Sequence, residues 1–554
     1  MTPRIRPRAL IWIVAAAYLA VTTVVSWPLV TRLPTSLAGD YGDSTFITWV
    51  IGWVSRHLTA MLSGDTGAWA AMWQAPIFAP EPATLAYSDH FIAQAAQALP
   101  LIWLTGNPLL AFNVLHLAAF VLTALAAHLL TYRFTGSHVA GAVAGVTFAF
   151  SPYRLHWSLP HLQTLSVYWW IFALLALDVF AEAGALLALA GATACIVLLS
   201  LSSAYLMAFT SLFTPLFVVW SLARHGRLRD RSRWLGVAGA GAAALLCVWP
   251  FVQPYLAMRK AVGVTRTMAE LTGNSVTLAG YWSEMPWLGP LLAMAAIAIV
   301  VPPVPATREL PRRARLGLFA VALAALILAL GPVIQVGNRS LPGPYGMLFA
   351  YVPGFQGLRV VHRFAVIGLL FISVLAGIGA AWLARWRVGA AAVVLLSALT
   401  TPTAWSRPYP MDVPLESRGL APVPEYLRPA MATPTIYRFA RTLPATAVLV
   451  EFPFGDLGYE IRYTFFTLAH ERRILNGYIG VQPASYLARL PVLQAPLADP
   501  DVSWQALAPA THAVVHTGAW DDDTGVRLRA WLEGRGARVV AQAQGAWIYA
   551  LPPR

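Results

Sequence analysis

Long apolar stretches recur through the first 400 residues of the chain and are separated by short polar loops. A membrane-spanning helix needs about 20 mostly apolar residues. The stretches that qualify lie near residues 10–27, 108–132, 138–152, 163–181, 184–201, 203–222, 235–253, 287–303, 315–335, 364–383 and 387–402. Hydrophobic residues make up 58% of the chain and charged residues 11%. The pattern predicts a polytopic α-helical membrane protein with about 11 transmembrane helices, or up to 13.

The arginines between these stretches fall on every second loop. The clusters are Arg4, Arg6 and Arg8; Arg133; Arg224, Arg227, Arg229, Arg231 and Arg233; Arg308, Arg312, Arg313 and Arg315; and Arg385 and Arg387. Basic loops stay in the cytoplasm, so the N-terminus is expected inside and the residues after 402 outside. The formal charge of +14 then reflects topology and lipid headgroups. Nucleic acid is not an expected partner.

The first outward loop, residues 28–107, is the largest and contains two half-apolar stretches, 45–63 and 91–104. The first stretch predicts an amphipathic helix with Phe46, Trp49, Val50 and Trp53 on one face. Tryptophan favours the headgroup zone, so this helix is expected to lie on the membrane plane. Alternatively, the two stretches form an extra hairpin of spans. Either way, residues 1–402 form one predicted transmembrane domain that includes the loop.

The composition changes after residue 402. Prolines between 403 and 434 predict a linker. Strand-like runs at 447–452, 511–515 and 537–541, with a helical stretch at 523–534, predict a small extracytoplasmic α/β domain over 435–554. The cysteines, Cys195 and Cys247, both fall within predicted spans, so no disulfide framework is expected in this domain.

The first candidate site is the segment Gly-Asp-Tyr-Gly-Asp at 39–43, just beyond the first span. Asp40 and Asp43 are three residues apart and can face the same way on a turn or first helical turn. Such a pair can act as a general base or as ligands of a divalent metal such as Mg²⁺ or Mn²⁺. The alternative is structural: Asp43 caps the following helix and Asp40 is a solvated loop acid.

A second group of candidates is basic and lies in the predicted outward loops: Arg154, His156, His161, Arg359, His362 and Arg363. Arginine gives fixed, forked donors to phosphate oxygens, which suits a phosphate whose charge grows in a transition state. The alternative is that these arginines only reach lipid phosphates.

Four further residues are candidates for acceptor binding or a secondary role. Asp89 and His90 could bind a metal, although capping of the next helix by Ser88 or Asp89 is the simpler interpretation. Glu270 and Glu284, in a later outward loop, are alternative acids or solvated loop residues.

The layout and several short motifs resemble the GT-C membrane glycosyltransferases, and more closely uncharacterised bacterial members of that group. The motifs are Gly-Asp-x-x-Asp at 39–43 followed by Trp49 and Trp53, Tyr-Ser-Asp-His at 87–90, Ser-Pro-Tyr-Arg at 151–154 with His-Leu-Gln at 161–163, and Leu-Arg-Val-Val-His-Arg at 358–363. Several members have two adjacent acids, whereas Asp40 and Asp43 are separated by two residues.

The resemblance implies a function at the outer face of a bacterial inner membrane, in the cell envelope. A polyprenyl-phosphate donor would give a hexosyl or pentosyl unit to an acceptor, which could be a glycan, a lipid or a protein. Arg154, His161, Arg359, His362 and Arg363 would bind the donor phosphate. Asp40 is slightly preferred as the base because it is nearer the first span, which leaves Asp43 as a cap or metal ligand.

Two other classes of function remain open. A transporter or flippase of lipid or polysaccharide should carry charges at mid-membrane and show inverted repeats, but the predicted spans are nearly free of charge and no such repeat is evident. A non-catalytic membrane assembly protein would show no pocket lined by carboxylates.

Overall fold

The computed structural model describes residues 7–263, 266–302, 310–337, 339–405, 408–415, 422–429 and 432–553. The predicted cytoplasmic arginines Arg4, Arg6 and Arg308 and parts of the predicted linker lie outside these ranges. Contacts divide the chain into two compact units. Unit 1 comprises residues 1–27, 116–250 and 264–409, and unit 2 comprises residues 28–115, 251–263 and 410–554. The domain boundaries drawn from the sequence stay a prediction.

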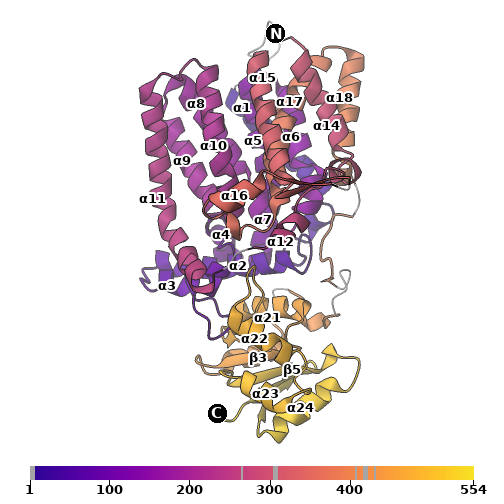
Figure 1. Ribbon diagram of the computed structural model, residues 1–554. Coiled ribbons are helices and arrows are strands. Elements are labelled where there is room, and N and C mark those ends of the chain that lie inside the picture. The colour runs from indigo at the N-terminus through magenta and orange to yellow at the C-terminus, as the bar shows by residue number, and fades with distance from the viewer. Residues whose placement is uncertain are drawn as a thin grey trace. The chain divides into compact units, whose positions relative to one another are not determined.

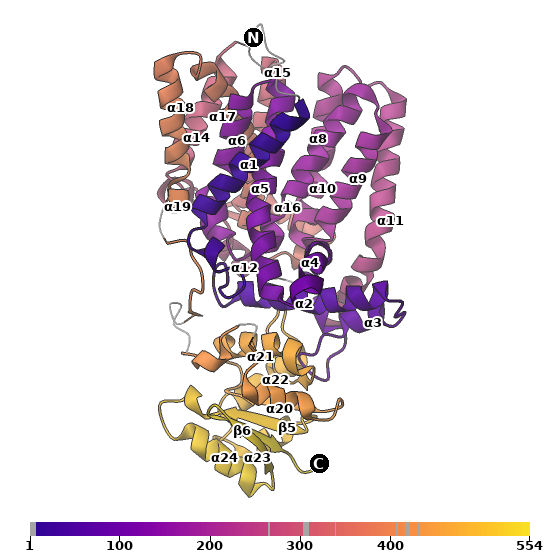
Figure 2. The same ribbon diagram turned by 180° about the vertical axis from the view of Figure 1, so that it is seen from behind.

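Unit 1 is built of apolar helices. Its principal helices are α1 (Pro7–Val25), α6 (His138–Ala149), α7 (Leu162–Leu165), α8 (Tyr168–Ala183), α9 (Leu186–Ser200), α10 (Ala204–Arg224), α14 (Leu288–Val300), α15 (Arg312–Ala329), α17 (Ala365–Leu383) and α18 (Arg387–Thr400). Two long helices, α5 (Pro108–Thr135) and α11 (Arg231–Val262), continue from one unit into the other. Helices α8, α9 and α10 lie side by side in both views (Figures 1 and 2).

Helix α17 is the centre of a second group of helices in unit 1. It packs against α6, α14 and α15 and is buried along nearly its whole length. Gly377 and Gly379 make this packing possible, because a Cβ atom there would collide with the carbonyl oxygens of Ala140 and Met294. Small residues let membrane helices approach closely, and here they admit a neighbour on each side of α17.

A buried carboxylate ties α5, α8 and α10 together. Asp178 accepts hydrogen bonds from Arg133 Nε at 2.9 Å, Ser221 Oγ at 2.7 Å and Arg224 Nη1 at 3.0 Å. A charge in an apolar bundle is stable only when it is paired, so these partners fix how the three helices pack.

The helices of unit 1 connect through short elements. These are the π-helical turn η3 (Tyr153–Trp157), the helices α12 (Met268–Gly273), α13 (Gly280–Ser283), α16 (Tyr345–Tyr351) and α19 (Pro402–Trp405), and the hairpin of β1 (Val333–Val336) and β2 (Arg339–Pro342). The hairpin is absent from the sequence prediction, because its exposed strands lack a clear alternation of polar and apolar residues.

Within the described part of the chain, five helices are long and apolar enough to cross a membrane: Pro108–Thr135, Leu162–Ala183, Ala204–Arg224, Arg231–Val262 and Val361–Leu383. Shorter apolar helices lie at Leu10–Val25, Ile92–Thr105, Leu186–Ser200, Leu288–Val300 and Arg387–Thr400. The protein is therefore a multi-pass, mostly helical membrane protein.

Unit 2 combines the first large loop with the C-terminal residues. The loop forms α2 (Asp43–Leu62), α3 (Ala68–Trp73) and α4 (Ile92–Thr105). The C-terminal part forms β3 (Val448–Phe452), β4 (Arg473–Ile474), β5 (His512–His516), β6 (Arg538–Ala543) and β7 (Ala546–Ala550), with α20 (Thr435–Thr442), α21 (Leu457–His470), α22 (Ala484–Leu493), α23 (Pro500–Ala506) and α24 (Thr524–Gly534). Strands β3, β5 and β6 occupy segments in which the sequence predicts strands.

The five strands form one mixed sheet in the order β4-β3-β5-β7-β6, with helices around it (Figure 1). Strand β3 runs parallel to β4 and β5, whereas β7 is antiparallel to both of its neighbours. The chain leaves β3 for β4 on one side and then returns to β5 on the other. The order of the strands therefore reverses at β3, so the carboxyl ends of β3 and β5 form a topological switch point.

Helix α2 packs against α21, α3 and α4. The Nε1 atom of Trp49 donates to Thr467 Oγ1 at 2.8 Å, and the Trp49 side chain is fully buried. Trp49 therefore packs inside the protein, and the expected position of α2 on the membrane plane stays a prediction. The apolar surface of Trp49 is buried against protein, and its only donor is satisfied by α21.

Candidate active site

The segment that carries the first candidate acid is fixed by an extended partner from beyond the membrane helices. Tyr41 N donates to Val413 O, Val413 N donates to Gly39 O, each at 3.0 Å, and Gly39 N donates to Pro410 O at 2.9 Å. Asn113 Oδ1 accepts from Ala38 N at 3.0 Å. The positive φ of 84° at Gly39 makes the bend that this pairing needs.

Asp40 and Asp43 have different environments although they are three residues apart. Asp40 is 4% exposed, and its Oδ1 accepts from Gly42 N at 3.0 Å, which closes a tight turn. Asp43 is half-buried and is the first residue of α2. Gly42 occupies the N-cap position without a side-chain bond, so Asp43 is not the cap of this helix. A negative charge at Asp43 is favoured by the positive end of the helix dipole.

Tyr478 contacts the second acid from the C-terminal part of unit 2. Its hydroxyl donates to Asp43 Oδ1 at 2.7 Å. Its ring meets the edge of Phe46, one turn further along α2, with centroids 5.3 Å apart. The apolar contact fixes the ring and thereby aims the hydroxyl at the carboxylate.

The carboxyl ends of the parallel strands supply the polar residues of this region. Tyr478 follows β4, and α21, which carries Arg462, follows β3. At the end of β5, His516 Nε2 lies 3.0 Å from Glu451 Oε2, and its Nδ1 lies 2.7 Å from the hydroxyl of Tyr426. Open α/β sheets commonly bind ligands at these strand ends, and here Tyr478, which follows β4, contacts Asp43.

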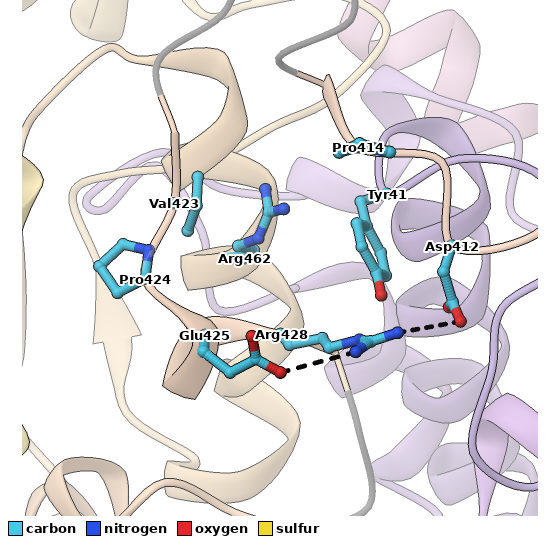
Figure 3. Close-up of a pocket in the computed structure, with 8 residues that line it drawn as sticks. All are labelled: Tyr41, Asp412, Pro414, Val423, Pro424, Glu425, Arg428 and Arg462. Carbon is cyan, nitrogen blue, oxygen red and sulfur yellow. Dashed lines mark hydrogen bonds and ion pairs between the residues drawn. The ribbon is translucent and has the colours of Figure 1, made fainter.

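A pocket of about 240 Å³ lies at Tyr41, the residue that follows Asp40 in the chain. It is lined by Tyr41, Asp412, Pro414, Val423, Pro424, Glu425, Arg428 and Arg462 (Figure 3). Arg428 Nη2 lies 3.0 Å from Asp412 Oδ2. Burial raises the pKa of the Tyr41 phenol, and the charge of Asp412 adds to the rise. Tyr41 therefore lines the pocket as a neutral hydroxyl.

The basic candidates belong to unit 1, and the structure brings several of them together. The hydroxyl of Tyr153 lies 3.1 Å from both Nδ1 and the carbonyl oxygen of His362. The guanidinium carbon of Arg363 lies 4.7 Å from the ring centroid of Tyr205, whose hydroxyl accepts from Arg359 N at 3.1 Å. The segment 358–363 thus contacts both the loop after α6 and the start of α10.

Arg154 differs from the other basic candidates because it is fully buried. Its guanidinium donates to Ala149 O at 3.3 Å and, through Nη2, to Thr123 Oγ1 at 3.1 Å and Leu165 O at 3.2 Å. Burial lowers its pKa to about 9. These contacts exclude a side chain that reaches lipid phosphates, and they give Arg154 a role in joining α5, α6 and α7. Arg359 is exposed and Arg363 is buried.

The acids and histidines of the secondary group are dispersed. Asp89 is half-buried, and burial lowers the pKa of its neighbour His90 to about 3. His90 Nδ1 accepts from Ile92 N at 3.1 Å, and the N-cap of α4 is Phe91, so neither Ser88 nor Asp89 caps this helix. Glu270 pairs with Arg266 at 3.2 Å.

Glu284 and His156 line a second pocket of about 230 Å³ in unit 1. The other lining residues are Pro152, Tyr153, Trp157, Met285, Pro286, Trp287, Pro402 and Thr403. His161 is half-buried at the start of α7. Aromatic side chains and one carboxylate line this pocket, so its wall is partly apolar and partly charged. His156 belongs to the loop that also carries Arg154.

The divalent metal that the sequence suggests for Asp40 and Asp43 stays a prediction. Across the described residues, His, Cys, Asp and Glu side chains gather nowhere in a group of three that could hold a metal ion. At Asp43 one oxygen accepts a tyrosine hydroxyl, which is the environment of a base or an anchored carboxylate. Mg²⁺ commonly binds through one or two carboxylates together with waters and substrate phosphates, so two acids are compatible with it.

Several residues of these sites are missing from the sequence prediction. Tyr478 lies in a polar segment but is not distinguished from its neighbours by any motif. Arg462 and Arg428 have no local signal at all, and Tyr205 follows what reads as a tight turn. Each of them is brought to its site by tertiary pairing, which one sequence does not reveal.

Comparisons with known proteins find similar chains among solved structures. ArnT from Cupriavidus metallidurans bound to undecaprenyl phosphate is 14% identical, with a TM-score of 0.50 over 99% of this chain and 100% of that one. Its apo state gives a TM-score of 0.47 at 14% identity over 99% and 100% of the two chains. The Archaeoglobus fulgidus oligosaccharyltransferase gives 0.45 at 11% identity over 92% and 70%. No protein-family model and no curated protein matches.

The fold assignment rests on the first of these structures. It confirms the prediction of a GT-C fold, the fold of a class of membrane glycosyltransferases, over nearly the whole chain.

Proposed function

We propose that the protein is a membrane glycosyltransferase that moves a sugar from a polyprenyl-phosphate donor to an acceptor hydroxyl. The observation that carries this proposal is the GT-C fold, shared with an ArnT structure bound to undecaprenyl phosphate. Asp40 and Asp43, on the loop after the first apolar helix, support it. The pockets lined by Asp412 and Glu425 and by Glu284 also favour an enzyme over an assembly protein.

The proposed reaction is a single displacement. The acceptor oxygen forms a bond to the anomeric carbon, and the bond from that carbon to the phosphate oxygen of the donor breaks. The acceptor proton passes to an aspartate, and the polyprenyl phosphate leaves with the electron pair. Inversion at the anomeric carbon follows from one displacement.

Asp43 is the better candidate for the base. A general base must come within hydrogen-bond distance of the acceptor hydroxyl. Asp43 is half-buried, whereas Asp40 is almost enclosed and is used to close the turn to Gly42. The sequence alone favours Asp40, for its position nearer the first span, but accessibility favours Asp43. Tyr478 would orient the carboxylate of Asp43, and Asp40 would hold the loop.

Arg359 and Arg363 are the proposed ligands of the donor phosphate. Arg359 is exposed, and Arg363 lies against the Tyr205 ring at the same end of α17. The growing negative charge of a phosphate leaving group is stabilised by such cations. His362 and His161 would lie next to the bound phosphate. Arg154 would stabilise the site indirectly, because it joins α5, α6 and α7.

The finer topology is part of the proposal. Eleven spans with cytoplasmic arginine loops would place residues 28–107 and 435–554 on the outer face of a bacterial inner membrane. The chemistry would then occur outside the cytoplasm, where soluble nucleotide sugars are not available and lipid-linked donors are.

The proposal is tested by sugar transfer in reconstituted membranes. The purified protein, in vesicles that contain a panel of undecaprenyl-phosphate sugars, should release undecaprenyl phosphate when acceptor glycans or lipids are supplied. The assay counts donor consumption and product formation separately. If no donor in the panel is consumed while the protein remains folded, the enzyme proposal fails and a transporter or an assembly protein takes its place.

A further inference from the structure

The pocket at Tyr41 is lined by two arginines, Arg428 and Arg462, and by two carboxylates, Asp412 and Glu425. Figure 3 shows Arg462 from α21 on one side of the Tyr41 ring and Arg428 below it. Their guanidinium carbons lie 5.3 Å and 5.6 Å from the ring centroid. Two cations thus flank one phenol within a pocket of about 240 Å³. At roughly 30 Å³ per water, this is space for about eight waters, which suits a single charged group or one sugar unit.

The two arginines are held in different ways. The Arg462 side chain belongs to a residue that is only 3% exposed, and its Nη1 donates to Gly458 O at 2.6 Å. Arg428 bonds Asp412 at 3.0 Å, and its second carboxylate neighbour, Glu425, lies 3.6 Å away with a side chain that is 90% exposed. An exposed pair at that distance contributes little. An incoming oxyanion can therefore take the place of Glu425 without breaking a strong pair.

The topology of the sheet gives an independent reason to expect a ligand here. The segment that contains η7 (Glu425–Leu427) lies at the carboxyl ends of β3 and β5, because Tyr426 bonds His516 at the end of β5 and Tyr459 of α21 donates to Pro422 O at 2.9 Å. Open α/β sheets bind ligands at the point where the strand order reverses. Pro424, Glu425 and Arg428 line the pocket from this segment.

We propose that the pocket lined by Tyr41, Arg428 and Arg462 is a subsite for an oxyanion, a phosphate or carboxylate carried by the acceptor. Tyr41 lies between Asp40 and Asp43 in the chain. An acceptor anchored by its anion at Tyr41 would therefore be held on the same short loop that carries the candidate base. The acceptor is then an anionic glycan or glycolipid. This inference rests on the proposed function and gives it an acceptor class.

The test is equilibrium binding of inorganic phosphate and of glucuronate to the full-length protein in detergent, without donor. Arg462→Gln and Arg428→Gln should each weaken the binding of the preferred anion about tenfold or more, because a charge-assisted contact is lost. Arg438→Gln is the matched control, since Arg438 is an exposed arginine of α20 that lies outside the pocket. Arg428 is partly exposed, so its variant is expected to fold even if the Arg462 variant does not.

The test compares the two anions with each other, and it compares the variants Arg428→Gln and Arg359→Gln. Preference for phosphate identifies a phosphorylated acceptor, and preference for glucuronate identifies a uronic acid; either supports the subsite. Binding that survives in Arg359→Gln but weakens in Arg428→Gln separates this pocket from the donor phosphate. An unchanged Kd in Arg428→Gln, or no binding of either anion to the wild type, overturns the inference. Because no turnover is measured, that failure would leave the proposed function standing.

Discussion

The hydroxyl of Tyr478 donates a hydrogen bond of 2.7 Å to the carboxylate of Asp43, 435 residues earlier in the chain. This bond makes the C-terminal α/β part a component of the candidate site. The same region contributes Arg462 and Arg428 to the pocket at Tyr41. Substitutions in the C-terminal residues can therefore change both the proposed base and the proposed acceptor subsite.

Replacement of Tyr478 by phenylalanine tests the orienting role of its hydroxyl. The ring contact with Phe46 is kept and only the hydrogen bond is lost. We expect kcat to fall about ten- to a hundredfold, since a hydrogen bond to a charged group contributes roughly 1.5–3 kcal/mol, while KM for the donor stays the same. Tyr351→Phe, at a tyrosine that is 81% exposed, is the control. A normal kcat in Tyr478→Phe would show that this bond does not position the base.

Arg154 and Arg359 should separate stability from binding. Arg154→Met leaves Leu165 O and Thr123 without their buried donor, so the free energy of unfolding should fall by about 1–3 kcal/mol for each unsatisfied group. Arg359→Ala removes an exposed side chain and should leave the melting temperature near the wild type while donor binding weakens about tenfold. Thermal melting in detergent and undecaprenyl-phosphate binding are measured on both. A stable Arg154→Met that loses donor binding would restore Arg154 as a phosphate ligand.

Because His470 is buried as a neutral ring, we expect the free energy of unfolding to decrease in acid. Burial lowers its pKa to about 3, and its Nδ1 accepts from Arg472 N at 3.1 Å, which requires the neutral ring. Below about pH 6.5 the unfolded chain binds a proton at this histidine, whereas the folded chain does not. The free energy of unfolding therefore decreases as the pH is lowered, by up to about 1.4 kcal/mol per pH unit. His470→Asn keeps an acceptor without the titration. Melting temperatures from pH 7 to pH 5 should decline less in this variant, and an identical decline would refute the assignment.

Reporter fusions test the topology. Fusions after Arg133, Arg229, Arg312 and Arg385 should report the cytoplasm, and fusions at Gly64 and at the C-terminus should report the outside. A C-terminal fusion that reports the cytoplasm would contradict the orientation and, with it, the use of lipid-linked donors at the outer face.

The sequence predicts the features that depend on local pattern. Apolar runs predict the membrane helices, because the bilayer demands about 20 such residues, and the period of Phe46, Trp49 and Trp53 predicts α2. The strand β5 is visible as a β-branched run ending at Val515. Asp40 and Asp43 can be recognised from the sequence as candidate site residues, because two acids lie close together just after an apolar helix.

The features that depend on pairing across the chain are not predictable from one sequence. The pairing of Gly39 with Val413 joins the first loop to residues that read as a linker. From the sequence, Trp49 resembles a tryptophan of the headgroup zone, whereas in the structure its indole nitrogen donates to Thr467. Arg154 has the same local appearance as Arg359, and only burial distinguishes them. In each case the partner is distant in sequence and the local pattern is compatible with both environments.

Sugar transfer by Asp43→Asn tests most directly whether Asp43 is the general base. The substitution keeps the shape and the acceptor for Tyr478 but removes the proton-accepting charge, so transfer should fall about a hundredfold or more. Asp40→Asn keeps the acceptor for Gly42 N and should lose less. Asp65→Asn is the matched control, because Asp65 is an exposed acid that closes the same kind of turn by accepting from Gly67 N at 2.8 Å. We expect all three variants to fold normally and only Asp43→Asn to lose nearly all transfer. Full transfer by Asp43→Asn would show that Asp43 is not the base.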